Sequence, residues 1–375
     1  MKTSRFFTLM ALVGILSMAV SSCETNKDIT PQQDILPNSF SVNIPSSISN
    51  RNFIHGGSTG GRVSSDSIKG NDVYRNLGTF IAVGEEASKL VEGIVTGIKK
   101  YHIDRVLSMT YMSDDDKRTK KLVVTSAVEF EGQTWDYELT ITDTDSEGQA
   151  DGGKAMQIFW NKNQLIKGIA IVKPFNCDRV KNAGAGNAIF RIDYTEGGAR
   201  GYDAQMEVRI AGLPLASPLD NPFAIETLHM FAGKKGEVVD VFGNSNHPNA
   251  KLFTGNAGFN WAFVASGNDA KDLGVAEVGL PPSSLNTTDR AILLKDNSIK
   301  NVFTHEILAA WPGLDPVAVA KYLKNTAAPG YFSEKQGFIS GGVSPGVEWD
   351  ALASRLDALT PYSPKATSEL TLSFK

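Results

Sequence analysis

The chain has 375 residues, of which 41% are hydrophobic and 21% are charged, an ordinary composition for a globular protein. With 37 lysines and arginines against 41 aspartates and glutamates, its net charge at pH 7 is −4. This balance argues against a nucleic-acid-binding protein, which needs a basic surface, and against docking on an anionic membrane through a polybasic segment.

The first 22 residues have the pattern of a secretory signal peptide. Lys2 and Arg5 make a positive start, residues 6–20 are almost wholly apolar, and two serines precede Cys23. The apolar run is too short to span a membrane. This ending resembles the lipobox of bacterial lipoproteins of the Bacteroidetes type. The resemblance implies cleavage before Cys23, attachment of several acyl chains to that residue, and a lipid-anchored outer-membrane protein. Whether the protein faces the periplasm or the cell surface is left open.

Residues 23–71 are expected to form a flexible tether, because Ser, Asn, Pro, Gln and Gly dominate and apolar residues are sparse. Phe40, Val42 and Ile44 alternate, so a short edge strand ending at Pro45 is a second interpretation. Residues 72–375 are expected to fold as a single large β-rich domain, with 212–222 as the place where a subdivision would fall.

Cysteine usage agrees with a lipid anchor, because the chain contains two cysteines, Cys23 and Cys177. If Cys23 carries lipid, Cys177 has no intramolecular partner, so the exported domain is expected to fold without disulfides. Cys177 itself is interpreted as a small, partly buried residue at a strand end rather than a reactive thiol.

A helix of about 28 residues is predicted where the folded domain begins. It starts with Asn71 and Asp72 as caps, ends near Lys99 and Lys100, and carries one continuous apolar stripe. The stripe consists of two sets of residues spaced by seven: Leu77, Gly84, Val91 and Ile98, and Val73, Phe80, Ala87 and Ile94. This pattern predicts a helix that packs on a sheet.

Alternating apolar and polar residues on both sides of Glu131-Gly132 predict a β-hairpin. A two-residue turn there would pair Phe130 with Gln133, Val128 with Trp135, Val124 with Leu139 and Leu122 with Ile141. Further strands are expected at 155–160, 165–173, 188–194, 206–210, 225–231, 238–242, 259–265, 273–278 and 370–374. Asp315-Pro316 and Ser344-Pro345 are expected to start two short helices.

Together these elements predict an α+β fold. Its core is expected to be an extended antiparallel β-sheet, curled into a barrel-like shape, with a long N-terminal helix and two short C-terminal helices.

Known catalytic motifs fail in this sequence. His305-Glu306 begins like a zinc-protease motif, but Ala309 occupies the position of the second histidine. Ser344 lies in a Gly-x-Ser-x-Gly string, but Pro345 has no N–H to donate to an oxyanion, and no histidine follows. We therefore predict no catalytic residues.

One acidic loop has the ligand spacing of a calcium-binding loop. Asp143, Asp145, Glu147 and Asp151 occupy its positions one, three, five and nine, with Gly148 at position six. Lys154 stands where the bidentate glutamate belongs, and strands are expected to flank the loop. The hairpin topology predicts that Asp114, Asp115 and Asp116 lie at the same end of the sheet, with Lys117, Arg118, Lys120 and Lys121 nearby. A solvated acidic loop is the favoured interpretation, and a calcium site at these four residues is the alternative. No other cofactor is expected.

The sequence thus favours a non-catalytic, lipid-anchored protein of the cell envelope that binds an apolar ligand or an envelope partner, but no nucleic acid. One alternative is an envelope glycan hydrolase that uses two of the carboxylates Glu129, Asp136, Glu138 and Asp193. A second alternative is a structural or adhesive surface lipoprotein.

Overall fold

The computed structural model describes residues 40–49, 70–99, 106–161, 166–198, 200–217, 223–250 and 258–375. The predicted signal peptide, Cys23 and most of the predicted tether lie outside the described residues. The chain divides into two compact units. Unit 1 comprises Met1–Ser41, Glu86–Pro214 and Thr371–Lys375, and unit 2 comprises Val42–Glu85 and Leu215–Leu370.

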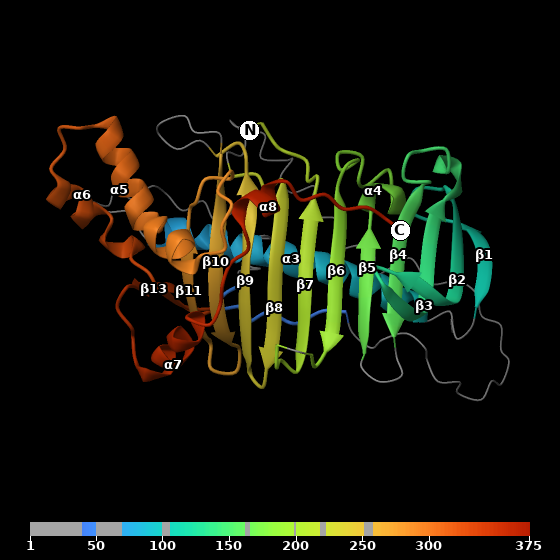
Figure 1. Ribbon diagram of the computed structural model, residues 1–375, viewed down its shortest axis with the longest axis horizontal. Helices are drawn as coiled ribbons and strands as arrows, with labels where there is room; N and C mark the ends of the chain where they lie inside the picture. The colour runs from blue at the N-terminus through green and yellow to red at the C-terminus, as the bar shows by residue number, and fades with distance from the viewer. Residues whose placement is uncertain are drawn as a thin grey trace. The chain divides into compact units, whose positions relative to one another are not determined.

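Unit 1 contains an antiparallel sheet whose strands follow the chain order, each pairing with its neighbours in sequence (Figure 1). Its strands are β1 (Leu107–Met112), β2 (Thr119–Phe130), β3 (Gln133–Asp143), β4 (Lys154–Asn161), β5 (Lys167–Val172), β6 (Ile189–Glu196) and β7 (Ala204–Ala211). Two short helical segments lie in its loops, η1 (Thr144–Ser146) and α4 (Pro174–Cys177).

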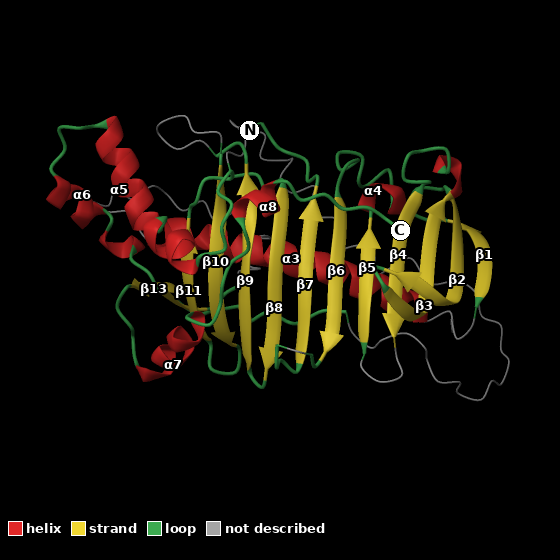
Figure 2. Cartoon of the chain, in the orientation of Figure 1, coloured by secondary structure: helices red, strands yellow, loops and turns green. Residues whose placement is uncertain are grey.

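Unit 2 has the same meander order and carries most of the helices (Figure 2). Its strands are β8 (Thr227–Lys235), β9 (Val238–His247), β10 (Phe259–Asn268), β11 (Leu273–Gly279), β12 (Gly330–Ser333) and β13 (Gly337–Gly341). Its helical segments are η2 (Ala291–Asp296), α5 (Ile299–Ala310), α6 (Pro316–Tyr322), η3 (Lys324–Thr326), α7 (Val347–Leu356) and α8 (Pro364–Ser368).

The large antiparallel sheet with a few helices confirms the sheet-dominated α+β class. The sequence leaves open whether the curled sheet closes into a barrel. In the structure it is not closed: among the described residues, β1 pairs only with β2, and β13 only with β12.

The long helix α3 (Gly70–Lys99) confirms the predicted N-terminal helix. In unit 2, the ring of Phe80 packs edge-on against Trp261, with 5.1 Å between the ring centroids. A Cβ at Gly84 would lie 2.5 Å from Cε of Met230, so the glycine lets the helix approach the sheet closely. In unit 1, Leu90 and Val91 of the same helix are buried.

Residues 40–49, which lie within the predicted tether, are packed on the folded units instead. In unit 1, Phe40 is fully buried, and a Cβ at Gly168 would lie 2.6 Å from its ring. In unit 2, the Ile44 N–H donates to Glu85 Oε1 at 3.2 Å, and Ser49 Oγ donates to Glu85 Oε2 at 2.9 Å. The segment has no regular strand. Its few apolar side chains are enough to anchor it, although its average composition is polar.

The predicted hairpin register is confirmed: Phe130 pairs with Gln133, Val128 with Trp135, Val124 with Leu139 and Leu122 with Ile141. Asp315 caps α6 as predicted, accepting from the Val317 N–H at 2.9 Å. The other predicted short helix begins later than expected, since α7 starts at Val347 after Gly346.

The predicted C-terminal strand is wrong, because residues 370–375 form no strand. Phe374 packs instead against a cluster of buried side chains in unit 1, which contains Trp135, Phe159, Ile169 and Ile171. The strands β1, β12 and β13 and the helices α5 and α8 were not predicted from the sequence.

Candidate functional site

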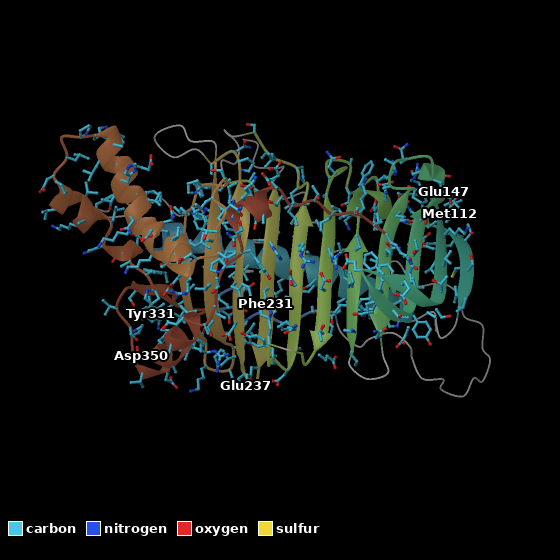
Figure 3. The ribbon with its side chains drawn as sticks, in the orientation of Figure 1. Met112, Glu147, Phe231, Glu237, Tyr331 and Asp350 are labelled. Atoms are coloured by element: carbon cyan, nitrogen blue, oxygen red, sulfur yellow. The ribbon has the colours of Figure 1, made fainter. Side chains whose placement is uncertain are left out.

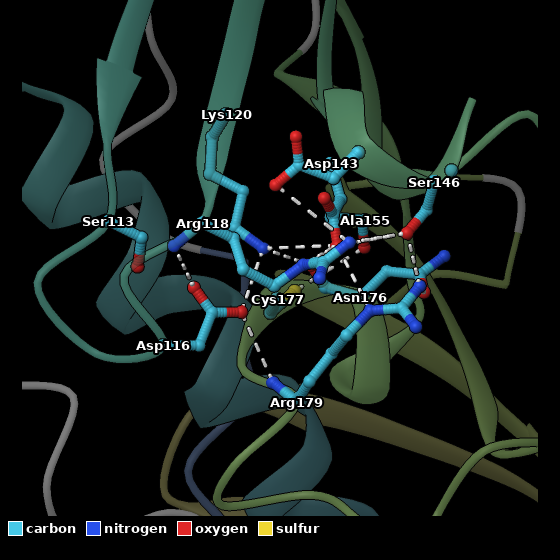
Figure 4. Close-up of polar contacts among 12 residues, drawn as sticks. Ser113, Asp116, Arg118, Lys120, Asp143, Ser146, Ala155, Asn176, Cys177 and Arg179 are labelled. Carbon is cyan, nitrogen blue, oxygen red and sulfur yellow. Dashed lines mark hydrogen bonds and ion pairs between the residues drawn. The ribbon is translucent and has the colours of Figure 1, made fainter.

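A cluster of charged and polar side chains lies at one end of the unit 1 sheet, where three loops meet (Figure 4). The contact between Arg118, from the turn after β1, and Asp143, at the end of β3, confirms that the acidic turn and the acidic loop share this end. Met112 and Glu147 mark the same end in Figure 3. The members of this Asp143 cluster are Asp116, Arg118, Lys120, Asp143, Ser146, Asn176 and Arg179.

Asp143 is the centre of the cluster, and its side chain is fully buried. Its Oδ2 accepts from Arg118 Nε at 2.8 Å and from Arg179 Nε at 3.0 Å, and Lys120 Nζ lies 3.6 Å away. Burial alone raises the pKa of this carboxyl, but the hydrogen bonds and charges of these cations outweigh it and lower the pKa of Asp143. Asp143 therefore stays ionised.

Two further residues tie the loops to this carboxylate. Ser146 Oγ accepts from Nη2 of Arg118 at 2.9 Å and from Nη2 of Arg179 at 2.6 Å. Lys120, almost fully buried, donates through Nζ to Asp116 Oδ2 at 3.0 Å and to the Asn176 carbonyl at 2.8 Å. Each charge faces an opposite one, as buried charges require. The cluster thus fastens three loops to each other.

Cys177, the free cysteine of the described residues, lies beside this cluster. Its Sγ is 3.4 Å from the Ala155 carbonyl, and burial raises the pKa of the thiol to about 12. The thiolate is the reactive form of cysteine, so this residue is chemically inert at neutral pH.

The structure gives the four predicted calcium ligands different surroundings. Asp143 is held by two arginines, whereas Asp151 accepts from Lys173 Nζ at 2.5 Å and from Asn176 Nδ2 at 3.0 Å. Asp145 and Glu147 are exposed. Among the described residues, no three His, Cys, Asp or Glu side chains are grouped to hold a metal ion. Calcium would have to displace the cations paired with Asp143 and Asp151, and its binding here stays a prediction.

The four carboxylates of the hydrolase alternative have separate hydrogen-bond partners. Glu129 accepts from Thr134 Oγ1, and Glu138 lies 3.6 Å from the ammonium of Lys375. Asp193 pairs with Arg191 at 2.8 Å and with Arg209 at 3.0 Å. For Asp136, the backbone N–H donates to Asn161 Oδ1 at 2.7 Å. None of these interactions joins two of the four carboxylates, so no observation favours an acid–nucleophile pair.

A buried Ser–His pair, which sequence reasoning missed, lies in unit 2 on β9. His247 Nδ1 is 3.0 Å from the Phe223 carbonyl, which can only accept, so this nitrogen carries the proton. Nε2 is then free to accept from Ser245 Oγ, 2.7 Å away. Burial lowers the pKa of His247 to about 3, so the ring is neutral at pH 7.

This pair resembles a nucleophile and its base, but both side chains are fully buried. Phe80, Phe259 and Trp261 lie around the imidazole, with ring centroids 4.5 to 6.1 Å from its own. A substrate has no access to Ser245 in this arrangement. The pair instead satisfies two polar groups inside an apolar layer.

Strand β1 lies at the edge of the sheet among the described residues of unit 1, and its side chains are unusually exposed. Five of its six residues are exposed, with Met112 at 67% and Met109 at 39% of their full exposure. The strand contains no charge, proline or glycine. Natural edge strands are generally protected by such residues, by bulges or by a covering segment.

The other edge strand, β13, contains two glycines among its five residues. A Cβ at Gly341 would lie 2.7 Å from the Ala327 carbonyl and 2.8 Å from the Asn325 carbonyl. The segment 325–327 therefore lies over one face of β13. Within the described part of the chain, β1 pairs with β2 alone.

Comparison with known proteins adds no assignment: no family model, no curated protein and no solved structure matches this chain. None of the helices described by the structure is long and apolar enough to cross a membrane. The candidate site therefore rests on the geometry of unit 1 alone.

Proposed function

We propose that this chain is a non-catalytic, lipid-anchored protein of the cell envelope that binds an extended segment of a partner protein by strand addition at β1. The observation that carries the proposal is the exposed, uncharged strand β1, which pairs with β2 alone among the described residues. Backbone N–H and C=O groups along such an edge give affinity to an added strand, and alternate side chains give it specificity.

The dimensions of the edge favour a single extended segment as the occupant. Six residues of antiparallel strand extend about 20 Å. A stable dimer of folded proteins buries roughly 1,000 Å² or more, which is more than one short strand edge supplies. The uncharged sequence of β1 also suits an uncharged, proline-free partner segment with apolar residues at alternate positions, because neither strand then brings an unpaired charge to the contact.

The buried Asp143 cluster supports this function by fixing the β1–β2 turn. Arg118 and Lys120 follow that turn directly, and both are held by Asp143. A strand whose end is fixed loses less conformational entropy when a partner binds to it. The cluster is thus interpreted as the support of the binding edge.

A labelled peptide with the sequence of residues 107–112 serves as the probe, since a β1 edge can pair with a second copy of its own sequence. We expect saturable binding to the wild-type protein by fluorescence polarisation. Met109→Lys with Met112→Lys should weaken it at least tenfold, because lysines on an edge strand oppose pairing. Val180→Lys is the matched control, because Val180 is 73% exposed and lies outside β1.

Three outcomes would overturn the proposal. The first is equal peptide binding by the double lysine variant, and the second is equal binding of a peptide with proline at its fourth position, which lacks an N–H there. The third is a wild-type dimer at micromolar concentration that the double variant abolishes. That result would make a second copy of the chain the occupant of the edge.

A further inference from the structure

The helices α5 and α6 form a hairpin in unit 2 that projects away from the strands (Figure 2). It has its own small core of Ile307, Val319 and Leu323, with Phe303 and Leu308 packed against it. The turn between the helices is well defined: the Trp311 N–H donates to the Ile307 carbonyl at 2.9 Å, and the Leu314 N–H to the Trp311 carbonyl at 3.1 Å.

The turn of this hairpin presents large apolar side chains to solvent. Trp311 is 52% exposed, Leu314 44% and Val317 74%, all within seven residues. Tyr322, at the end of α6, is 39% exposed. Single exposed apolar residues are common on proteins, but a contiguous group at a projecting turn marks an interaction surface. We call Trp311, Leu314 and Val317 the hairpin tip.

We propose that the hairpin tip inserts into the surface of a lipid bilayer as a second membrane contact of this protein. Tryptophan and tyrosine favour the membrane–water interface, because each combines an apolar ring with a polar group. A narrow, projecting turn also suits a soft bilayer better than a rigid partner, which would need a complementary pocket.

The exposed lysines near the tip lie behind it on the hairpin. They are Lys321, near the end of α6, and Lys324, in η3, whereas Asp315 is the exposed acid in the turn itself. Lysine side chains can lie along apolar surface with the ammonium group at the lipid headgroups. Exposed cations near an apolar tip favour anionic lipids.

The predicted anchor would supply the high local concentration that a small tip needs. Seventeen residues lead from Cys23 to the packed Phe40, which limits their reach to about 60 Å when fully extended. A lipid at Cys23 would therefore hold Phe40 of unit 1 within that distance of the bilayer. Attachment of the same chain to the bilayer raises the effective concentration of a weak second contact. This inference concerns α5 and α6, and is independent of strand addition at β1.

The test uses the full mature chain with Cys23→Ser, so that no lipid contributes, and vesicles of phosphatidylethanolamine and phosphatidylglycerol. We expect co-sedimentation with the vesicles, and a blue shift of tryptophan emission that Trp311→Phe abolishes. Leu314→Asp with Val317→Asp should reduce the bound fraction at least tenfold. The matched control is Val343→Asp with Val347→Asp, which places the same charges at positions that are 69% and 80% exposed elsewhere in unit 2.

The melting temperature of each variant, measured without vesicles, shows whether it is folded. The proposal is overturned if the Cys23→Ser chain does not co-sediment with the vesicles. It is also overturned if the tip and control variants bind them equally. Either result would leave strand addition at β1 unaffected, because the peptide assay uses no lipid.

Discussion

Arg118 and Arg179 come from different loops, yet both donate through Nε to the same oxygen of Asp143, at 2.8 and 3.0 Å. Two guanidinium groups are thereby held side by side, with one fully buried carboxylate between them and the ammonium of Lys120 close by. Such an arrangement is stable only while the central negative charge is present, because the cations would otherwise repel one another.

Asp143→Asn should therefore destabilise the protein by about 3–5 kcal/mol, the usual cost of removing one partner from a buried ion pair. The free energy of unfolding is measured by urea denaturation at pH 7. Asp145→Asn is the control, because the Asp145 side chain is 52% exposed and its loss should change stability by less than about 0.5 kcal/mol. Equal effects of the two substitutions would show that the cluster does not fasten the loops.

The buried His247 predicts a loss of stability in mild acid. Its pKa is about 3 in the folded protein and about 6.5 in the unfolded chain, so below pH 6.5 only the unfolded state takes up the proton. Its contribution to stability is complete above pH 6.5 and falls by about 1.4 kcal/mol per pH unit below it, down to the folded pKa. Urea denaturation at pH 6.5, 5.5 and 4.5 measures this slope.

His247→Gln should reduce the dependence of the free energy of unfolding on pH between 6.5 and 4.5, even if the substitution lowers stability at every pH. The substitution His305→Gln should not, because the His305 side chain is 79% exposed. The lowered pKa values of Asp116, Asp143 and Asp151 affect stability at a lower pH. These carboxyl groups stabilise the folded protein while they are ionised, and this stabilisation is lost as the pH falls below about 4. A slope between pH 6.5 and 4.5 that His247→Gln leaves unchanged would contradict the assignment.

Calcium is expected to raise the melting temperature no more than magnesium does. The carboxylates of Asp143 and Asp151 are already paired with cations, and a calcium ion needs six to eight oxygens. Thermal unfolding in millimolar calcium or magnesium measures the effect. A calcium-specific rise that Asp145→Ala with Glu147→Ala abolishes would instead establish the site predicted from the sequence.

Cys23→Ser should release the protein from membranes in intact cells. Without the predicted lipid, a single hairpin tip gives only a weak, reversible contact, whereas several acyl chains hold stably. Cell fractionation measures the share of protein in the membrane pellet. If the variant stays in the pellet after a high-salt wash, lipid at Cys23 is not the main attachment.

The sequence predicted those elements whose pattern is local. The β2–β3 register follows from strict alternation around Glu131-Gly132, because a shift by one residue would move Trp135 to the other face. Strand β1 was missed because its alternation of apolar and polar residues is short: it runs from Leu107 to Tyr111 and is broken by Met112. Residues 40–49 were missed because their average composition is polar, although Phe40 is fully buried.

The candidate sites depend on contacts that spacing alone does not encode. Arg179 contacts Asp143 although 36 residues separate them in the chain. The sequence of the acidic loop alone therefore does not show that this carboxylate is paired with an arginine from the loop after α4. The pairing of Ser245 with His247 was missed for another reason. Ser245 and His247 are alternate residues of β9 and therefore lie on the same face of the strand. That face is buried by α3, whose Phe80 packs on His247 and lies far earlier in the chain.

The packing of α3 has a consequence for the order in which the molecule assembles. This helix leaves the ribosome, and any export channel, before every strand, yet its partners are encoded later: Phe80 contacts Trp261, and Tyr74 stacks on Phe338. The strands, by contrast, pair with their sequence neighbours and can form hairpin by hairpin as they emerge. The apolar stripe of α3 is therefore exposed for most of synthesis, and it is the segment on which a chaperone would act first.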